Sequence, residues 1–335
     1  MQTYEHQLLP VNDITLSLYS AGPADGPVVW LLHGFPESWF SWRHQIQALV
    51  EAGFRVLVPE MRGYGQTSAP DDIAAYDLIT VCSDIQAAMD LLGQHRVAVV
   101  GHDWGAPVAW HLALLEPERV QVVGAMAVPY GGRPKKPAIE MIRSQFADRF
   151  NYILYFQQPG VAEAELNQDI PRTLRMMMHN TSAAVPKDFF LQEKPAGSLL
   201  HEGMQDPGSP PDWCDQDAFA VYVRTFEGRG FGGALNWYRN FERTWERTAP
   251  LAGRKIMQPA LFLLGDKDPV GTLEAHTLKK MPKWVPDLEQ HMLEHCGHWV
   301  QSEQPEQVSS LLLGFLKRRY TDTKLSASDS SPAMQ

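Results

Sequence analysis

The segment GHDWG at 101–105 places an aspartate between two glycines, directly after the apolar run VAVV. A helix-period segment follows, so the aspartate is expected at a tight turn from a strand into a helix. Flanking glycines leave room for such a turn, which lifts the central side chain to the carboxyl edge of a sheet. Open α/β sheets bind their ligands at that edge. We therefore interpret Asp103 as a nucleophile.

A carboxylate nucleophile indicates which bond is broken. Attack by Asp103 on a saturated carbon forms an ester, whose carbonyl water can hydrolyse, whereas a serine would form an ether that water does not readily cleave. Since an ordinary aspartate has a pKa of about 4, it is ionised at neutral pH and needs no base to attack. The substrate is therefore expected to carry an electrophilic sp³ carbon, as an epoxide or an alkyl halide does.

Two later segments offer a base and an acid. His298 lies in HCGHWVQSEQP after the last predicted strand, and Asp268 lies in LFLLGDKDPV after the strand before it. We expect His298 to take a proton from water, and Asp268 to fix its tautomer and stabilise the imidazolium. The order nucleophile, acid, histidine is that of the α/β-hydrolase fold. Asp266, on the same loop, is the alternative for the acid.

The segment HGFP at 33–36 follows another apolar run, VVWLL. In the α/β-hydrolase fold this loop supplies a backbone N–H opposite the one that follows the nucleophile. The N–H groups of Phe35 and Trp104 are therefore expected to hold the oxyanion that forms when water attacks the ester. A cis Phe35–Pro36 bond would help to aim the loop.

The elements that position these residues follow from hydrophobic periodicity. After a predicted hairpin at 3–9 and 14–20, short Val-rich runs alternate with helix-period segments, which indicates a parallel sheet covered on both faces. The runs lie at 28–34, 54–60, 96–102 and 120–128, and the helical segments at 38–52, 77–92 and 106–115. Strand patterns stop after residue 130 and return at 260–265 and 288–294, before a closing helix at 305–319.

The predicted fold class is therefore α/β, with a mostly parallel eight-stranded sheet and a mostly helical insertion. We expect a core formed by 1–130 and 251–320, and a helical cap, or lid, at 131–250. The polar tail 321–335 is predicted to be disordered.

The composition of the chain indicates which partners are not expected and which location in the cell is favoured. The chain has 335 residues, 44% of them hydrophobic, and a formal net charge of -10, which argues against nucleic acid as a partner. Neither a signal peptide nor a membrane anchor is expected, because the apolar runs are too short. The unpaired pattern of Cys82, Cys214 and Cys296 favours free thiols and a cytoplasmic location. The sequence suggests no metal ion or cofactor.

Six segments together resemble the soluble epoxide hydrolase family, specifically its catalytic domain without the phosphatase-like domain or membrane anchor of some members. They span nearly the whole chain: HGFPESWFSWRHQ (33–45), RGYGQTSAP (62–70), GHDWGA (101–106), NYILYFQQPGVAEAEL (151–166), NWYRN (236–240) and GHWVQSEQP (297–305). The resemblance implies an α/β-hydrolase fold and opening of an epoxide to a vicinal diol, often in detoxification.

The resemblance also implies two tyrosines in the insertion that protonate the epoxide oxygen, and they correspond to Tyr152 and Tyr238. Tyr155, three residues after Tyr152, is the alternative to it. A phenol is acidic enough to protonate the alkoxide formed on ring opening. We expect a small apolar epoxide as substrate, a monomer or homodimer, and a pocket formed by Phe35, Pro36, Trp104, Phe156 and Trp299.

Three other functions share parts of this pattern. Haloalkane dehalogenases use the same catalytic residues, but usually have Asn where this chain has Phe35, and no paired lid tyrosines. Fluoroacetate dehalogenases have arginines near the nucleophile, where this chain has Trp104. Non-catalytic α/β-hydrolase-fold proteins tend to lose members of the triad, and this chain keeps them.

Overall fold

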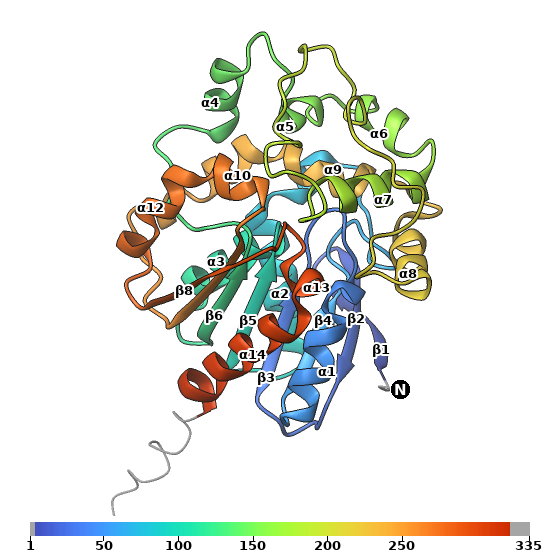
Figure 1. The fold of residues 1–335 in the computed structure, drawn as a ribbon. Coiled ribbons are helices and arrows are strands. Elements are labelled where there is room, and N and C mark those ends of the chain that lie inside the picture. The colour runs from blue at the N-terminus through green and yellow to red at the C-terminus, as the bar shows by residue number, and fades with distance from the viewer. Residues whose placement is uncertain (1–3, 322–335) are drawn as a thin grey trace, which may run out of the picture.

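A single eight-stranded sheet runs through the centre of the molecule, in the order β1-β2-β4-β3-β5-β6-β7-β8 (Figure 1). This computed structural model describes residues 4–321. Strands β1 and β2 form an antiparallel hairpin, β2 is antiparallel to β4, and all other neighbouring strands are parallel. The strands are β1 Glu5–Val11, β2 Ile14–Ala21, β3 Val28–Leu32, β4 Arg55–Pro59, β5 Val97–His102, β6 Val120–Met126, β7 Ala260–Gly265 and β8 Leu288–Leu293.

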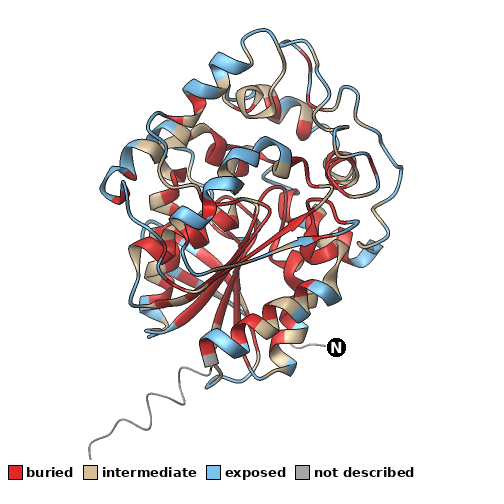
Figure 2. Cartoon of the chain, turned by 60° about the vertical axis from the view of Figure 1, so that its left-hand side comes forward, coloured by how far each residue is buried: buried red, intermediate tan, exposed pale blue. Residues whose placement is uncertain are grey.

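The central strands are apolar on both faces because helices cover both faces. All six residues of β5 are buried, and Figure 2 shows the sheet as the most buried layer. Val97 and Val99 pack into one hydrophobic cluster with α2 (Leu78–Leu91) and α3 (Gly105–Leu115). Ala98 and Val100 point the other way, into a second cluster with α1 (Arg43–Glu51) and α14 (Pro305–Leu316). This alternation is the side-chain period of a strand.

The segment between β6 and β7 is formed by helices and loops that lie over one end of the sheet (Figure 1). Its helices are α4 Ala138–Gln145, α5 Tyr152–Tyr155, α6 Val161–Leu166, α7 Ile170–Asn180, α8 Gln216–Phe226, α9 Gly232–Arg239 and α10 Phe241–Arg247. Strands β7 and β8 then complete the sheet. The helices α11 Pro269–Leu273 and α12 Ala275–Trp284 connect these two strands, and α13 Val300–Glu303 follows β8.

The predicted fold class is confirmed, and each predicted strand has a counterpart displaced by only a few residues at its ends. One helix differs, because the segment predicted at 38–52 begins with a 3₁₀ turn, η1 (Trp39–Trp42), before α1. The side chain of Ser38 accepts the N–H of Phe40 and so caps that turn. The described residues end in a π-helical turn, η4 (Lys317–Thr321), and the rest of the predicted tail lies outside them.

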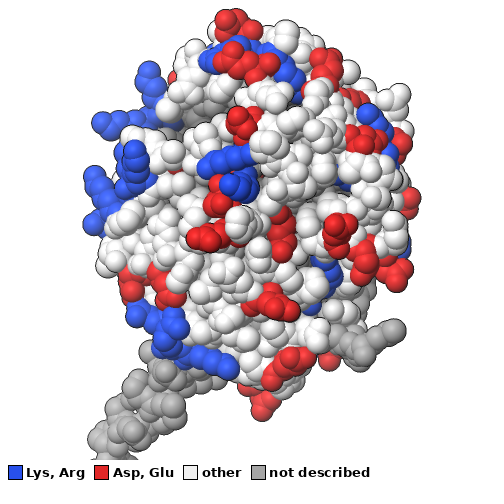
Figure 3. All heavy atoms as spheres, in the orientation of Figure 1, with Lys and Arg blue, Asp and Glu red and all other residues white. Residues whose placement is uncertain are grey.

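The distribution of surface charge and the length of the helices are relevant to binding of charged partners and to insertion into a membrane. On the face in Figure 3, acidic and basic side chains are scattered among uncharged ones. Within residues 4–321, none of the helices has the length and apolar content needed to cross a bilayer.

Candidate active site

Asp103 lies at a strained turn between β5 and α3. Its φ is 48°, a left-handed conformation that is uncommon for residues other than glycine. A Cβ on Gly101 would approach the carbonyl oxygen of Gly105 to 2.0 Å, and one on Gly105 would approach that of Leu32 to the same distance. Positions 101 and 105 must therefore both be glycine for the turn to close.

The Asp103 carboxylate is held on both oxygens. Oδ1 accepts the backbone N–H of Phe35 at 2.7 Å, and Oδ2 lies 3.5 Å from His298 Nε2. The backbone nitrogen of Trp104 lies close to the same loop, since a Cβ on Gly34 would come within 2.6 Å of it and within 2.4 Å of Oδ1. The Phe35–Pro36 bond is cis.

Electrostatics keep the Asp103 carboxylate ionised. Burial alone would raise its pKa, but the hydrogen bond and positive charge of His298, together with the Phe35 N–H, hold the pKa below its usual value. The side chain is 14% exposed, so it faces an opening while still desolvated. The group is therefore anionic at neutral pH.

His298 bridges the two carboxylates. Its Nδ1 lies 3.1 Å from Oδ2 and 3.2 Å from Oδ1 of Asp268, whose side chain is fully buried. Burial alone would lower the pKa of His298, but the charge of Asp268 and the hydrogen bonds to Asp103 and Asp268 raise it well above its usual value. The imidazole is thus fixed with one nitrogen on Asp268 and the other toward Asp103.

Asp266, the alternative acid, faces elsewhere. Its Oδ1 accepts the backbone N–H of Cys296 at 3.1 Å, and Oδ2 lies 3.4 Å from Lys267 Nζ. The structure therefore brings Asp268, and not Asp266, to His298.

Tyr152 and Tyr238 lie together although they come from different helices of the insertion. Their ring centroids are 6.1 Å apart, and both residues line a cavity that contains Asp103. Burial, and next the charge of Asp103, raise the pKa of both hydroxyls, which therefore stay protonated at neutral pH. Tyr155 instead donates its hydroxyl to Glu165 at 2.8 Å. Of the two candidates on α5, only Tyr152 lines the cavity.

The cavity is narrow, about 50 Å³, and mostly apolar. Four of the predicted wall residues line it, namely Phe35, Pro36, Phe156 and Trp299. Trp104 is not among the lining residues, because its ring packs against Trp237, Tyr238 and Phe241. Several lining residues were not predicted from the sequence: Thr181, Phe190, Leu200, Val270 and Leu273.

Comparison with known proteins identifies the family. A family model described as alpha/beta hydrolase fold matches residues 27–305. Epoxide hydrolase A of Mycobacterium tuberculosis is 42% identical over 316 residues, which cover 92% of this chain and 96% of that protein. The chain belongs to the epoxide hydrolase family. The bifunctional epoxide hydrolase 2 of the mouse is 39% identical over 90% of this chain, which spans only 54% of that longer protein.

Solved structures agree with this membership. Epoxide hydrolase A from Mycobacterium thermoresistibile superposes with a TM-score of 0.88 at 40% identity, covering 94% of this chain and 98% of that one. An epoxide hydrolase from an endophytic Streptomyces gives a TM-score of 0.90 at 38% identity, covering 94% and 95%. The family inferred from the motifs is thus confirmed, and the chain is an epoxide hydrolase rather than a dehalogenase or a non-catalytic binding protein.

A buried glutamate that the sequence reasoning missed connects the loop after β3 with the end of β5 and with α13 in this epoxide hydrolase. Glu37 is fully buried and accepts the N–H of Gly34 at 3.1 Å and a hydrogen bond from Gln301 at 3.1 Å. It also bonds His102 Nδ1, whose ring contacts the carbonyl oxygen of His298 at 2.8 Å through Nε2. Glu37 follows HGFP directly, but partners over 60 residues away could not be seen in the sequence.

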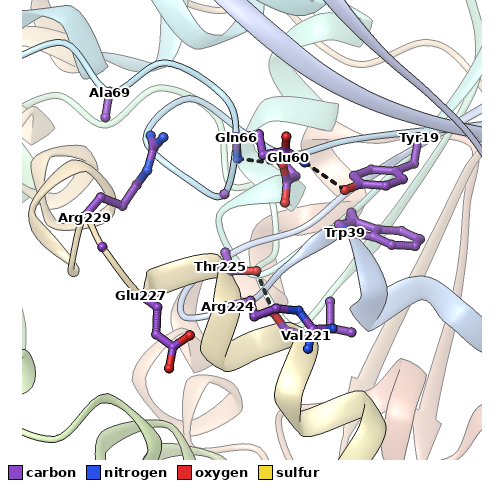
Figure 4. Close-up of a pocket in the computed structure, with 12 residues that line it drawn as sticks. Tyr19, Trp39, Glu60, Gln66, Ala69, Val221, Arg224, Thr225, Glu227 and Arg229 are labelled. Carbon is purple, nitrogen blue, oxygen red and sulfur yellow. Dashed lines mark hydrogen bonds between the residues drawn. The ribbon is translucent and has the colours of Figure 1, made fainter.

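A second and larger cavity, about 750 Å³, opens between the loop after β4 and the region of α8 (Figure 4). Its buried Glu60 accepts the N–H of Gln66 at 2.8 Å, so this carboxylate anchors the loop. Tyr19 and Trp39 stack there with centroids 3.8 Å apart. None of the residues predicted for chemistry lines this cavity, so we assign the chemistry to the smaller one.

Proposed function

We propose that this enzyme converts epoxides to vicinal diols through an ester on Asp103. Oδ2 of Asp103 attacks a ring carbon, the bond from that carbon to the epoxide oxygen breaks, and Tyr152 or Tyr238 donates a proton to the departing oxygen. Two donors on one side of the cavity polarise the ring while the carboxylate attacks from the other. The observation that carries this proposal is the meeting of both tyrosines and Asp103 in one cavity.

Hydrolysis of the ester would complete the cycle. His298 takes a proton from water, the hydroxide attacks the ester carbonyl, and the N–H groups of Phe35 and Trp104 hold the resulting oxyanion. The bond between the carbonyl carbon and Oδ2 then breaks, Oδ2 receives the proton held by His298, and the diol leaves with this oxygen from Asp103. Support comes from the bond of Phe35 N–H to Oδ1, the atom that would become the oxyanion.

A single turnover in ¹⁸O-water tests the covalent route. The diol of the first turnover is expected to be unlabelled, because its new oxygen comes from Asp103, while the label appears in the peptide that contains Asp103. Both are read by mass spectrometry, with styrene oxide as the substrate. Label in the first-turnover diol would mean direct attack by water and would refute the ester.

The two candidate acids are expected to differ in effect. Asp268→Asn removes the charge that stabilises the imidazolium and should slow ester hydrolysis by up to about 10⁴-fold, the range of a lost general base. Asp266→Asn keeps an oxygen that can accept the Cys296 N–H, so its loss should be much smaller. Pre-steady-state rates of ester hydrolysis measure both. A larger loss in Asp266→Asn would reverse the assignment.

The role of the insertion, the polarity of the substrate, the oligomeric state and the location in the cell are further proposals. We propose that 131–250 acts as a cap over a core of 1–130 and 251–320. An apolar substrate is favoured by walls such as Phe156, Met177, Leu200 and Val270. A monomer or homodimer in the cytoplasm, predicted from the sequence, is our proposal for assembly and location.

A further inference from the structure

The loop that carries His298 is held by the carboxylate of Glu303, at the end of α13. Oε1 accepts the N–H of Trp299 at 3.0 Å, and Oε2 accepts the N–H of Gly297 at 3.0 Å. These two peptide groups flank His298 on either side. Oε2 also accepts the N–H of Ala183, just beyond α7, at 2.8 Å. One carboxylate thus binds three N–H groups from two segments more than 100 residues apart in sequence.

The same two segments touch directly. The N–H of His298 donates to the carbonyl oxygen of Thr181 at 2.9 Å, and Thr181 itself lines the catalytic cavity. Gly297 lies flat against the neighbouring backbone, since a Cβ there would come within 2.4 Å of the Ser182 carbonyl carbon and 2.5 Å of Ala183 N. We call this packing of residues 181–183 against 296–299 the base–cap contact.

The loop has no regular secondary structure around His298, so specific acceptors must fix its backbone. Carboxylate acceptors form stronger hydrogen bonds to backbone N–H groups than neutral ones do. Burial raises the pKa of Glu303, while the three N–H groups lower it in part. The three N–H groups, at 2.8 to 3.0 Å from its two oxygens, are the contacts by which Glu303 holds the loop.

We propose that Glu303 is a positioning residue for the base, which holds His298 where ester hydrolysis requires it by closing the base–cap contact. This inference rests on the proposed function. The two half-reactions depend on it differently. Asp103 attacks as a carboxylate and needs no base. Its own turn and the N–H of Phe35 hold it in addition to His298, and Glu303 bonds neither of these two groups. The water attack requires the imidazole within hydrogen-bond reach of a small target.

Glu303→Gln tests the proposal. Glutamine has the same length but only one oxygen, so at least one N–H group of the base–cap contact faces an amide NH₂. Ester formation should keep nearly its wild-type rate, whereas ester hydrolysis should slow by about 10- to 100-fold, because a displacement of about 1 Å can cost 100-fold. Quenched-flow mass spectrometry with styrene oxide resolves both rates. Glu306→Gln, an exposed residue in the first turn of α14, is the matched control and should leave both unchanged.

A second variant keeps the test decisive if Glu303→Gln fails to fold. Gly297→Ala forces a methyl group into the base–cap contact while leaving Glu303 intact, and it should give the same selective loss of hydrolysis. Unchanged hydrolysis, or an equal slowing of both steps, would overturn the positioning role. Absence of any ester in the wild-type enzyme would instead refute the proposed function, so the two failures are distinguishable.

Discussion

His298→Gln is expected to stop the enzyme after a single ester forms at each active site. Glutamine cannot take the proton from water, and loss of a general base typically costs about 10²–10⁴-fold. Ester formation should continue, because an aspartate is ionised at neutral pH without the help of a base, and the N–H of Phe35 still donates to Asp103 when His298 is replaced. Intact-mass measurement should therefore show enzyme plus one substrate, and the adduct should map to the peptide containing Asp103.

The pH dependence of the wild-type enzyme tests whether His298 is needed for ester hydrolysis but not for ester formation. In the free enzyme, Asp103 and Asp268 together raise the pKa of His298 against the effect of burial. Esterification removes the charge of Asp103, so the pKa of His298 should fall and the neutral base should be released. Ester hydrolysis should decline as pH drops through that lowered pKa, whereas ester formation should persist until Asp103 is protonated.

The His298→Gln variant also has an outcome that would contradict the assignment. If it loses turnover without accumulating the ester, His298 is not the base for ester hydrolysis alone.

The double variant Tyr152→Phe/Tyr238→Phe is expected to lose nearly all ring opening. An alkoxide is a poor leaving group without a proton donor, and loss of one general acid typically costs about 10²–10⁴-fold. Each single variant should retain partial activity, because the remaining hydroxyl lies in the same cavity and can still reach the oxygen. Pre-steady-state ester formation is the measurement, since the loss should be confined to that step.

Tyr155→Phe is the matched control for the double variant. The hydroxyl of Tyr155 donates to Glu165, and Tyr155 does not line the cavity, so ester formation should remain close to the wild-type rate. Near wild-type ester formation in the double variant would refute the role of the tyrosines. A larger loss in Tyr155→Phe than in Tyr152→Phe would show that the donor on α5 had been assigned to the wrong residue.

The sequence alone determined the features that depend on neighbours along the chain. A turn from strand to helix needs an apolar strand, two glycines and a helix, and all of these lie within residues 97–115, so Asp103 and its setting could be predicted. Buried strands are continuous apolar runs, and this local signal predicted the sheet. The order of Asp103, the acid and His298 could be read in the same way.

Only the tertiary structure decided between residues that lie close together in sequence. Asp266 and Asp268 share one loop, and the packing of β7 against β8 turns the second toward His298 and the first toward Cys296. Tyr152 and Tyr155 are three residues apart on α5, and the position of that helix over the sheet places Tyr152 at the cavity and the hydroxyl of Tyr155 against Glu165.

The hydrogen bonds of Glu37 and Glu303 are further features that the sequence alone did not predict. Both lie within motifs that the sequence displays, but each also has a partner far along the chain, His102 for Glu37 and Ala183 for Glu303. A hydrogen bond between distant segments leaves no periodic trace in sequence, because it depends on where the fold brings two backbones together and not on the residues beside each of them.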